Sequence, residues 1–188
     1  MKPWSIVTSR AALLPDADID TDKIIPARFM QGLDRRGLGV HLFADMRAID
    51  RRFMLDPAAR ILVTGRNFGA GSSREHAIWA LDDHGIRCVI APSFGGIFSG
   101  NAATNGMLLV TPAPGDFAAL LRVLAATPGQ PVTVDLADCT VTAGQLRFAF
   151  TIDGDLREAL RAGLDDIDRT LRHARAIDAY EARETAST

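Results

Sequence analysis

Cysteine is scarce in this chain, which has 188 residues and only two cysteines, Cys88 and Cys139. Both lie in apolar or alternating segments that are typical of strands. A disulfide framework is therefore not expected, and the cytoplasm is the default compartment. Iron–sulfur clusters usually take three or four cysteine ligands. The sequence thus predicts that this chain holds no such cluster by itself.

An excess of positive charge and a long apolar run are also missing. The 21 basic and 23 acidic residues give a net charge of −2, so the phosphate-neutralising charge of a nucleic-acid binder is absent. No apolar stretch approaches the roughly 18–20 residues that a membrane helix needs. The first residues, 1–7, carry one charge and no long apolar stretch, so a signal peptide is not expected. We expect neither nucleic acid nor a membrane as a partner.

The first 110 residues alternate between strand and helix patterns. Short apolar runs predict buried strands at 61–64, 87–91 and 107–110, after an earlier strand at 4–14. Helical stretches lie between these runs, and we expect Ser93 to cap the second of them. This alternation is typical of parallel β–α–β units and predicts an α/β fold.

The next segment combines a helix with antiparallel strands. The spacing of apolar residues over 117–124 predicts an amphipathic helix, which we expect Asp116 to cap. Apolar and polar residues alternate over 132–136 and again over 146–150. We expect antiparallel strands here, with a turn at 143–144.

The C-terminal segment has helical spacing from Leu156 to Ile177. Gly163 divides it into two helices, and Asp165 is expected to cap the second. The length suits one domain. We therefore predict a single domain over 1–188, in which about 153–185 form a helical extension.

Four aspartates lie within the segment from Asp16 to Lys23. Such a cluster suggests Ca²⁺, but an EF-hand loop needs a glycine at its sixth position and a glutamate at its twelfth. Thr21 and Ala27 stand at those positions. A turn with helix-capping aspartates is the better interpretation.

The glycine-rich segment from Gly65 to His76 joins a predicted strand to a predicted helix, which is a common arrangement for binding anions. Its spacing does not fit a phosphate-binding loop, a dinucleotide fingerprint or a nucleophile elbow. What remains are the hydroxyls of Ser72 and Ser73 and the guanidinium of Arg74, which can grip a small carboxylate. A second interpretation stays open, because Ser72 and Glu75 have the spacing of a capping box, and from spacing alone it is slightly favoured.

The segment from Asn67 to His76 resembles the swivelling-domain signature of the aconitase superfamily. Other motifs agree with this family in order and spacing, and the C-terminal ones resemble the bacterial isopropylmalate dehydratase small subunits; they are Asp20–Pro26, Val89–Phe94 with Ile97–Phe98, Asn105–Gly106, Phe150–Asp153, Gly163–Asp165 and Ile177–Ala182. The resemblance spans almost the whole chain. It implies a three-layer β/β/α swivelling domain of the aconitase type, with C-terminal helices.

The resemblance also implies a partner and a reaction. In this family a separate large subunit carries a four-iron four-sulfur cluster, and the small subunit closes over it. Together they interconvert 2-isopropylmalate and 3-isopropylmalate, which are hydroxy-dicarboxylates of leucine biosynthesis, by dehydration and rehydration. The chain alone is expected to be inactive, with no metal site of its own.

The family analogy assigns roles to individual residues. Ser72 would be the base, acting as an alkoxide that Arg74 and the amides of the following helix stabilise. Ser73 and Arg74 would also bind a substrate carboxylate, with Arg28 as a weaker second contact. Three apolar residues would form a pocket that suits a branched alkyl group; they are Phe29, Met30 and Leu33.

The chain departs from the family pattern at a few places, namely Ala70, Gly95–Gly96, Leu109–Val110 and a shortened 44–60 segment. None of these removes a proposed catalytic group. They leave open a related hydratase acting on citraconate, methylmalate or dimethylmalate. A carboxylate-binding module that regulates a partner without catalysis is the alternative from another class.

Overall fold

The structure of the chain is a computed structural model, and it describes residues 1–30, 34–50, 55–71 and 74–185. The strands are β1 (Ile6–Leu14), β2 (Ile61–Thr64), β3 (Cys88–Ile90), β4 (Leu108–Val110), β5 (Pro131–Asp135), β6 (Thr140–Ala143) and β7 (Leu146–Ala149). The α-helices are α1 (Thr21–Ile24), α2 (Ala44–Ile49), α3 (His76–His84), α4 (Gly96–Asn105), α5 (Pro114–Ala126), α6 (Gly154–Ala162), α7 (Asp166–Leu171) and α8 (Ala174–Thr185). Short 3₁₀ helices are η1 (Ala27–Phe29) and η2 (Gly39–His41).

The strands form one sheet in the order β4-β3-β2-β1-β5-β6-β7. Strands β1 to β4 are parallel, as the strand–helix alternation predicts, and β5 to β7 are antiparallel. The long strand β1 joins the two halves, because Ala11–Leu14 pair with β2 while Ile6–Arg10 pair with β5. One strand therefore carries the parallel half at one end and the antiparallel half at the other.

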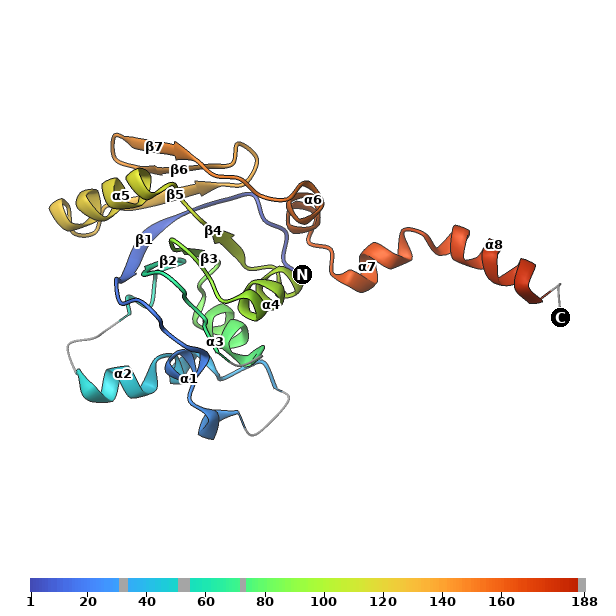
Figure 1. Ribbon diagram of the computed structural model, residues 1–188, viewed down its shortest axis with the longest axis horizontal. Coiled ribbons are helices and arrows are strands. Elements are labelled where there is room, and N and C mark those ends of the chain that lie inside the picture. The colour runs from blue at the N-terminus through green and yellow to red at the C-terminus, as the bar shows by residue number, and fades with distance from the viewer. Residues whose placement is uncertain (31–33, 51–54, 72–73, 186–188) are drawn as a thin grey trace.

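Two hydrophobic cores cover the two faces of the parallel half. Leu62 of β2 faces a core shared with helices α1, α3 and α4, whereas Ile61 and Val63 face a core shared with β5, β6, β7 and α5. All four residues of β2 are buried, as expected for a parallel strand covered on both sides. The sheet thus curls so that its antiparallel half lies over its parallel half, and Figure 1 shows β5–β7 above β2–β4 with α1–α4 below. This arrangement confirms the predicted three-layer β/β/α fold.

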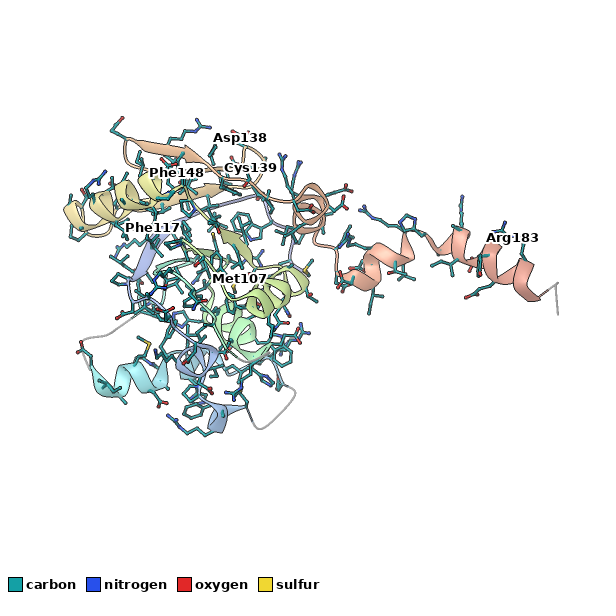
Figure 2. The ribbon with its side chains drawn as sticks, in the orientation of Figure 1. Met107, Phe117, Asp138, Cys139, Phe148 and Arg183 are labelled. Atoms are coloured by element: carbon teal, nitrogen blue, oxygen red, sulfur yellow. The ribbon has the colours of Figure 1, made fainter. Side chains whose placement is uncertain are left out.

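The C-terminal helices differ in how they pack. In α6, Ala159 and Leu160 are buried, and the carbonyl of Leu160 accepts a hydrogen bond from the Trp4 amide (2.9 Å). Gly163 ends α6 at a left-handed φ of +70°, and Asp165 caps α7, both as the sequence predicts. The prediction of one helix after Gly163 is wrong, because α7 and α8 are separate helices. Helices α7 and α8 project away from the sheet (Figure 1), and Arg183 of α8 lies far from the labelled core residue Phe148 (Figure 2). The division into one domain with an extension stays a prediction.

Two predicted helix caps are wrong. Helix α4 begins at Gly96 with Gly95 as its N-cap, and the hydroxyl of Ser93 instead accepts a hydrogen bond from the Asn67 amide (2.9 Å). Helix α5 begins at Pro114, so Asp116 lies inside its first turn. Proline suits the first helical position because its fixed φ is already helical and its missing N–H would be unpaired there.

The antiparallel half holds one strand more than the two that were predicted. Strand β6 lies between them, and its pairing with β7 closes a hairpin at the predicted turn, where Gly144 has a φ of +59°. The two predicted strands are therefore not each other's neighbours, because β6 separates β5 from β7.

Candidate active site at the carboxyl edge of the parallel strands

Three loops leave the parallel strands at the same edge of the sheet. They follow β1, β2 and β3, and they hold the aspartate-rich segment, the glycine-rich segment and residues 91–95. Because parallel strands all point one way, their carboxyl ends and the loops after them gather at one edge, where ligands bind in α/β folds. The topology therefore brings the Asp20–Pro26 and Asn67–His76 motifs together.

The glycine-rich loop is fixed on both sides by backbone hydrogen bonds. On one side the Gly69 amide donates to the Ile19 carbonyl (2.7 Å), and the Thr21 amide donates to the Ala70 carbonyl (3.1 Å). On the other side the Phe68 amide donates to the Ser93 carbonyl (3.1 Å). These bonds extend the pairing of β1, β2 and β3 beyond the strands, so the loop up to residue 71 is a continuation of the sheet.

Glycine is required at two points of this edge. Gly69 has a φ of +73°, and a Cβ atom there would run into the buried ring of Phe98. Gly95 has an ordinary φ, but its Cβ would collide with the carbonyl oxygen of Gly69. Close approach of the two loops therefore explains both glycines, while the ring of Phe68 packs edge-on against Phe98 at 5.3 Å.

The aspartate cluster binds basic groups and amides of the chain. Asp20 is the N-cap of α1 and accepts a hydrogen bond from the Lys23 amide (2.7 Å). Asp18 accepts hydrogen bonds from the side chains of Arg66 (3.0 Å) and Asn67 (2.9 Å). The capping interpretation is confirmed. Within the described residues, no group of three or more histidine, cysteine, aspartate or glutamate side chains could hold a metal ion.

Arg74 lies at the end of the glycine-rich loop and forms an ion pair with Asp22 of α1. Its side chain is 29% exposed, whereas that of Asp22 is 58% exposed. One nitrogen of the guanidinium is held by the carboxylate, which fixes the direction of the planar group. The sequence did not identify Asp22 as a site residue, although it lies in a motif that had been singled out. The predicted neighbours Ser72 and Ser73 lie outside the described residues.

The capping-box interpretation involves Ser72, which lies outside the described residues, and it stays a prediction; helix α3 is described from His76, with Glu75 as its N-cap. The Glu75 carboxylate accepts a hydrogen bond from the Asn105 side chain (2.6 Å). The amides of Ala77 and Ile78 donate to the carbonyls of Arg74 and Glu75. The amides of Ala77 and Ile78 are therefore paired within the chain, and the guanidinium of Arg74 is a described group of this loop that could stabilise an anion.

The predicted substrate loop lies beyond α1. Arg28 forms a two-pronged ion pair with Asp45 of α2, with one contact at 3.1 Å, and this hydrogen bonding raises the pKa of Arg28 and lowers that of Asp45. The ring of Phe29 stacks on His41 at 3.9 Å, and Phe29 and Met30 pack at the rim of the helix-side core. Within the described parts of the chain, Arg28, Phe29 and Met30 share no hydrogen bond, ion pair or ring contact with Arg74. Leu33 lies outside the described residues.

The two cysteines do not suit an iron–sulfur cluster. Cys88 is buried in β3, and this burial raises the pKa of its thiol. Cys139 lies in the turn between β5 and β6, beside Asp138 (Figure 2), in the other half of the sheet. Since a cluster needs about four converging thiolates, the described residues offer no place for one. No described helix combines the length and the apolar character that crossing a bilayer requires.

Comparisons with known proteins give a consistent result. The family model of the aconitase C-terminal domain matches residues 50–114, and the LeuD_N model matches residues 118–154. The chain is 47% identical to the 3-isopropylmalate dehydratase small subunit of Acidothermus cellulolyticus, over 99% of this chain and 96% of that protein. It is 43% identical to the protein of the same name from Frankia casuarinae, over 99% of this chain and 97% of that protein.

A solved structure is also similar along nearly the whole chain. The crystal structure of 3-isopropylmalate dehydratase from Methanocaldococcus jannaschii superposes with a TM-score of 0.70 at 27% sequence identity. The match covers 94% of this chain and 99% of that chain. The similarity therefore includes both the parallel half that carries the site and the antiparallel half.

Proposed function

This chain belongs to the family of 3-isopropylmalate dehydratase small subunits, and from that premise we propose that it is the small subunit of a hydro-lyase that interconverts 2-isopropylmalate and 3-isopropylmalate in leucine biosynthesis. The observation that carries the proposal is the 47% identity along the whole chain, together with the fixed glycine-rich loop at the carboxyl edge of the sheet. The cytoplasm is the expected compartment, because neither thiol is paired in a disulfide.

The reaction needs a base close to a substrate carboxylate. Dehydration removes a weakly acidic C–H proton beside a carboxylate and expels a hydroxyl group, and rehydration reverses these steps at the neighbouring carbon. We assign the base to Ser72, which immediately precedes Ser73 and Arg74 in the sequence. A serine hydroxyl is too weakly acidic to act unless its anion is stabilised, and a fixed guanidinium supplies such stabilisation. Arg74 is fixed because Asp22 holds it.

Binding of the substrate divides between two loops. Ser73 and Arg74 would hold one carboxylate, for which the guanidinium fork is well suited. Phe29, Met30 and Leu33 would form the pocket for the alkyl group of the substrate. Such an apolar pocket would disfavour a third carboxylate, because burying a charge without a partner costs free energy. Arg28 could act as the second carboxylate contact only by exchanging Asp45 for the substrate, since the two are paired in the structure.

The remaining chemistry belongs to the partner. We propose that a large subunit holds a four-iron four-sulfur cluster, which would act as the Lewis acid that takes the hydroxyl group. This chain would close over that subunit as the swivelling domain. Its own part is to bind and orient the hydroxy-dicarboxylate and to move the proton at the Ser72 hydroxyl.

Reconstitution tests this function directly. The chain would be co-expressed with the large subunit encoded in the same genome, and the purified complex would be assayed with 2-isopropylmalate, citraconate, 2-methylmalate and 2,3-dimethylmalate. We expect turnover with 2-isopropylmalate to exceed turnover with the other acids, and no turnover with the chain alone. A preference for one of the other acids would reassign the substrate, and an assembled, cluster-loaded complex without any turnover would favour a carboxylate-binding module.

A further inference from the structure

The Asn105–Gly106 motif has no part in the site described so far, yet Asn105 contacts the segment that carries Arg74. Asn105 is the last residue of α4, and its side chain makes three hydrogen bonds. Its oxygen accepts one from the indole nitrogen of Trp79 (3.0 Å), and its nitrogen donates to the Glu75 carboxylate (2.6 Å) and to the Asn101 carbonyl (2.8 Å). All three contacts are partly buried, so they are shielded from competing water.

The polarity of these contacts selects a carboxamide. The indole N–H of Trp79 can only donate, whereas an ionised Glu75 carboxylate can only accept. A side chain that bridges them must therefore present an acceptor to one and a donor to the other. Asparagine does this, while an ionised aspartate of the same shape would face Glu75 with a second negative charge. The orientation of the Asn105 amide is fixed for the same reason.

The bridge anchors the exit of the glycine-rich loop. Glu75 follows Arg74 directly, and its carbonyl accepts the amides of Ile78 (2.9 Å) and Trp79 (3.1 Å) in the first turn of α3. The backbone of Glu75 is thus held by α3, and its side chain is held by α4. Arg74 precedes Glu75 in the chain, and its guanidinium contacts Asp22. A displacement of Glu75 would therefore move Arg74 and turn its guanidinium away from Asp22.

The same support reaches the end of the predicted substrate loop. The guanidinium of Arg35 lies 4.8 Å from the centre of the Trp79 ring, on the side chain that the Asn105 amide holds. The side chains of Arg35, Trp79, Asn105 and Glu75 therefore form one connected group, which reaches from the described residues after the predicted substrate loop to the neighbour of Arg74. A chain of contacts of this kind places two loops relative to each other without touching the substrate.

We propose that Asn105 is a positioning residue of this enzyme, whose carboxamide holds Glu75 and thereby keeps Arg74 in its working geometry. The inference rests on the proposed function, because the effect of Asn105 on the site is measured as a change in the turnover of the complex. It is distinct from that function, since Asn105 is assigned neither to the substrate nor to the reacting atoms.

The test uses an exchange of donor and acceptor. Asn105→Asp keeps the shape and the bond from Trp79 but loses the donor to Glu75 and to the Asn101 carbonyl. We expect kcat/KM of the assembled complex to fall by up to about 100-fold, as small misplacements of catalytic groups do. Glu75→Gln in the Asn105→Asp background restores a donor to this contact and should recover most of the loss. Glu75→Gln alone keeps an acceptor oxygen and should remain close to wild type.

Asn101→Asp is the matched control. It adds the same charge to the same helix, one turn earlier, at a side chain without a hydrogen bond to the described residues. We expect it to leave kcat/KM unchanged. Full activity of the Asn105→Asp complex, a loss that Glu75→Gln does not recover, or an equal loss in Asn101→Asp would each overturn the proposal.

Hydrogen–deuterium exchange in the chain alone gives a readout that does not depend on turnover. The amides of Ala77, Ile78 and Trp79 should exchange faster in the Asn105→Asp chain and return towards wild type in the double variant, because they bond to the carbonyls of Arg74 and Glu75. Unchanged exchange would refute the anchoring even if the wild-type complex had no activity. An inactive wild-type complex with the expected exchange pattern would instead refute the proposed function.

Discussion

Adding one methyl group to the glycine-rich loop tests the close approach that shapes the site. Gly69 and Gly71 both have left-handed backbones, with φ values of +73° and +91°, but their surroundings differ. A Cβ at Gly69 would run into Phe98, whose side chain is buried, whereas among the described residues a Cβ at Gly71 would meet nothing closer than the Cβ of Asp20 at 3.8 Å. The pair therefore separates the cost of the backbone conformation from the cost of crowding.

The magnitudes follow from these two terms. An alanine in the left-handed region costs about 1–2 kcal/mol, and we expect Gly71→Ala to lower the free energy of unfolding by that amount. Gly69→Ala adds overpacking against a core ring, which costs about 1–3 kcal/mol, so its expected loss is about 2–5 kcal/mol in total. The difference between the two variants measures the contact between Gly69 and Phe98.

Urea unfolding followed by circular dichroism gives these free energies, with equal m-values as the check that the unfolded states are comparable. A double-mutant cycle sharpens the result, because Phe98→Leu trims the ring and should reduce the cost of Gly69→Ala. Equal losses for Gly69→Ala and Gly71→Ala, or a cost of Gly69→Ala that Phe98→Leu leaves unchanged, would refute the packing described for this loop.

Three further predictions concern single groups. Asp22→Asn should change the free energy of unfolding by less than about 1 kcal/mol, because exposed ion pairs contribute little, but it should lower kcat of the complex about tenfold or more by freeing Arg74. The control is Asp138→Asn, which breaks the exposed pair with Arg147. An unchanged kcat in Asp22→Asn would contradict the role of Asp22. The Asp168 amide donates a hydrogen bond to the Asp165 carboxylate and lowers the pKa of that carboxyl, so the cap should stabilise α7 at neutral pH and lose its effect as the pH falls through the lowered pKa. Chemical shifts of residues 166–171 should follow this titration. The same acid transition in Asp165→Asn would contradict the role of the Asp165 cap. Iodoacetamide should modify the folded chain once, at Cys139, because burial raises the pKa of the Cys88 thiol, and mass spectrometry that finds two modifications before unfolding would contradict this.

Much of the fold could be predicted because local pattern and final packing agree there. The apolar runs at β2, β3 and β4 are buried on both faces, and a strand covered on both sides has little room for polar residues. Strand β6 was not predicted because apolar and polar residues alternate over Thr140–Ala143 as they do in the strands on either side. The period of this alternation alone does not show how many strands the stretch contains. Register and hairpin closure decide that number.

The helix caps show where local chemistry is ambiguous. Serine and aspartate are good N-caps in general, but Ser93 is engaged by the Asn67 amide from another loop, and Pro114 starts α5 ahead of Asp116. A residue type that can cap a helix can also serve a neighbouring loop. The choice depends on contacts that are remote in sequence.

The same distinction applies to the site. The glycine-rich loop could be identified from residue types at fixed spacing, and Arg74 could be singled out as its candidate for binding a carboxylate. The partners Asp22 of Arg74, Asp45 of Arg28 and Asn105 of Glu75 could not, because they are 52, 17 and 30 residues away in the chain and meet through the parallel pairing and helix packing. The site roles of all these candidates stay predictions; they are Ser72, Ser73, Arg74, Arg28, Phe29, Met30 and Leu33.

Turnover of the assembled complex with Ser72 replaced tests the central claim most directly. Because Glu75 is the N-cap of α3, we expect Ser72→Ala and Ser72→Gly to fold, to assemble with the large subunit and to keep the wild-type melting temperature. With 2-isopropylmalate as substrate, both complexes should lose about 10²- to 10⁴-fold in kcat, which is what a general base contributes. Near-normal kcat in either assembled variant would contradict the assignment of Ser72 as the base.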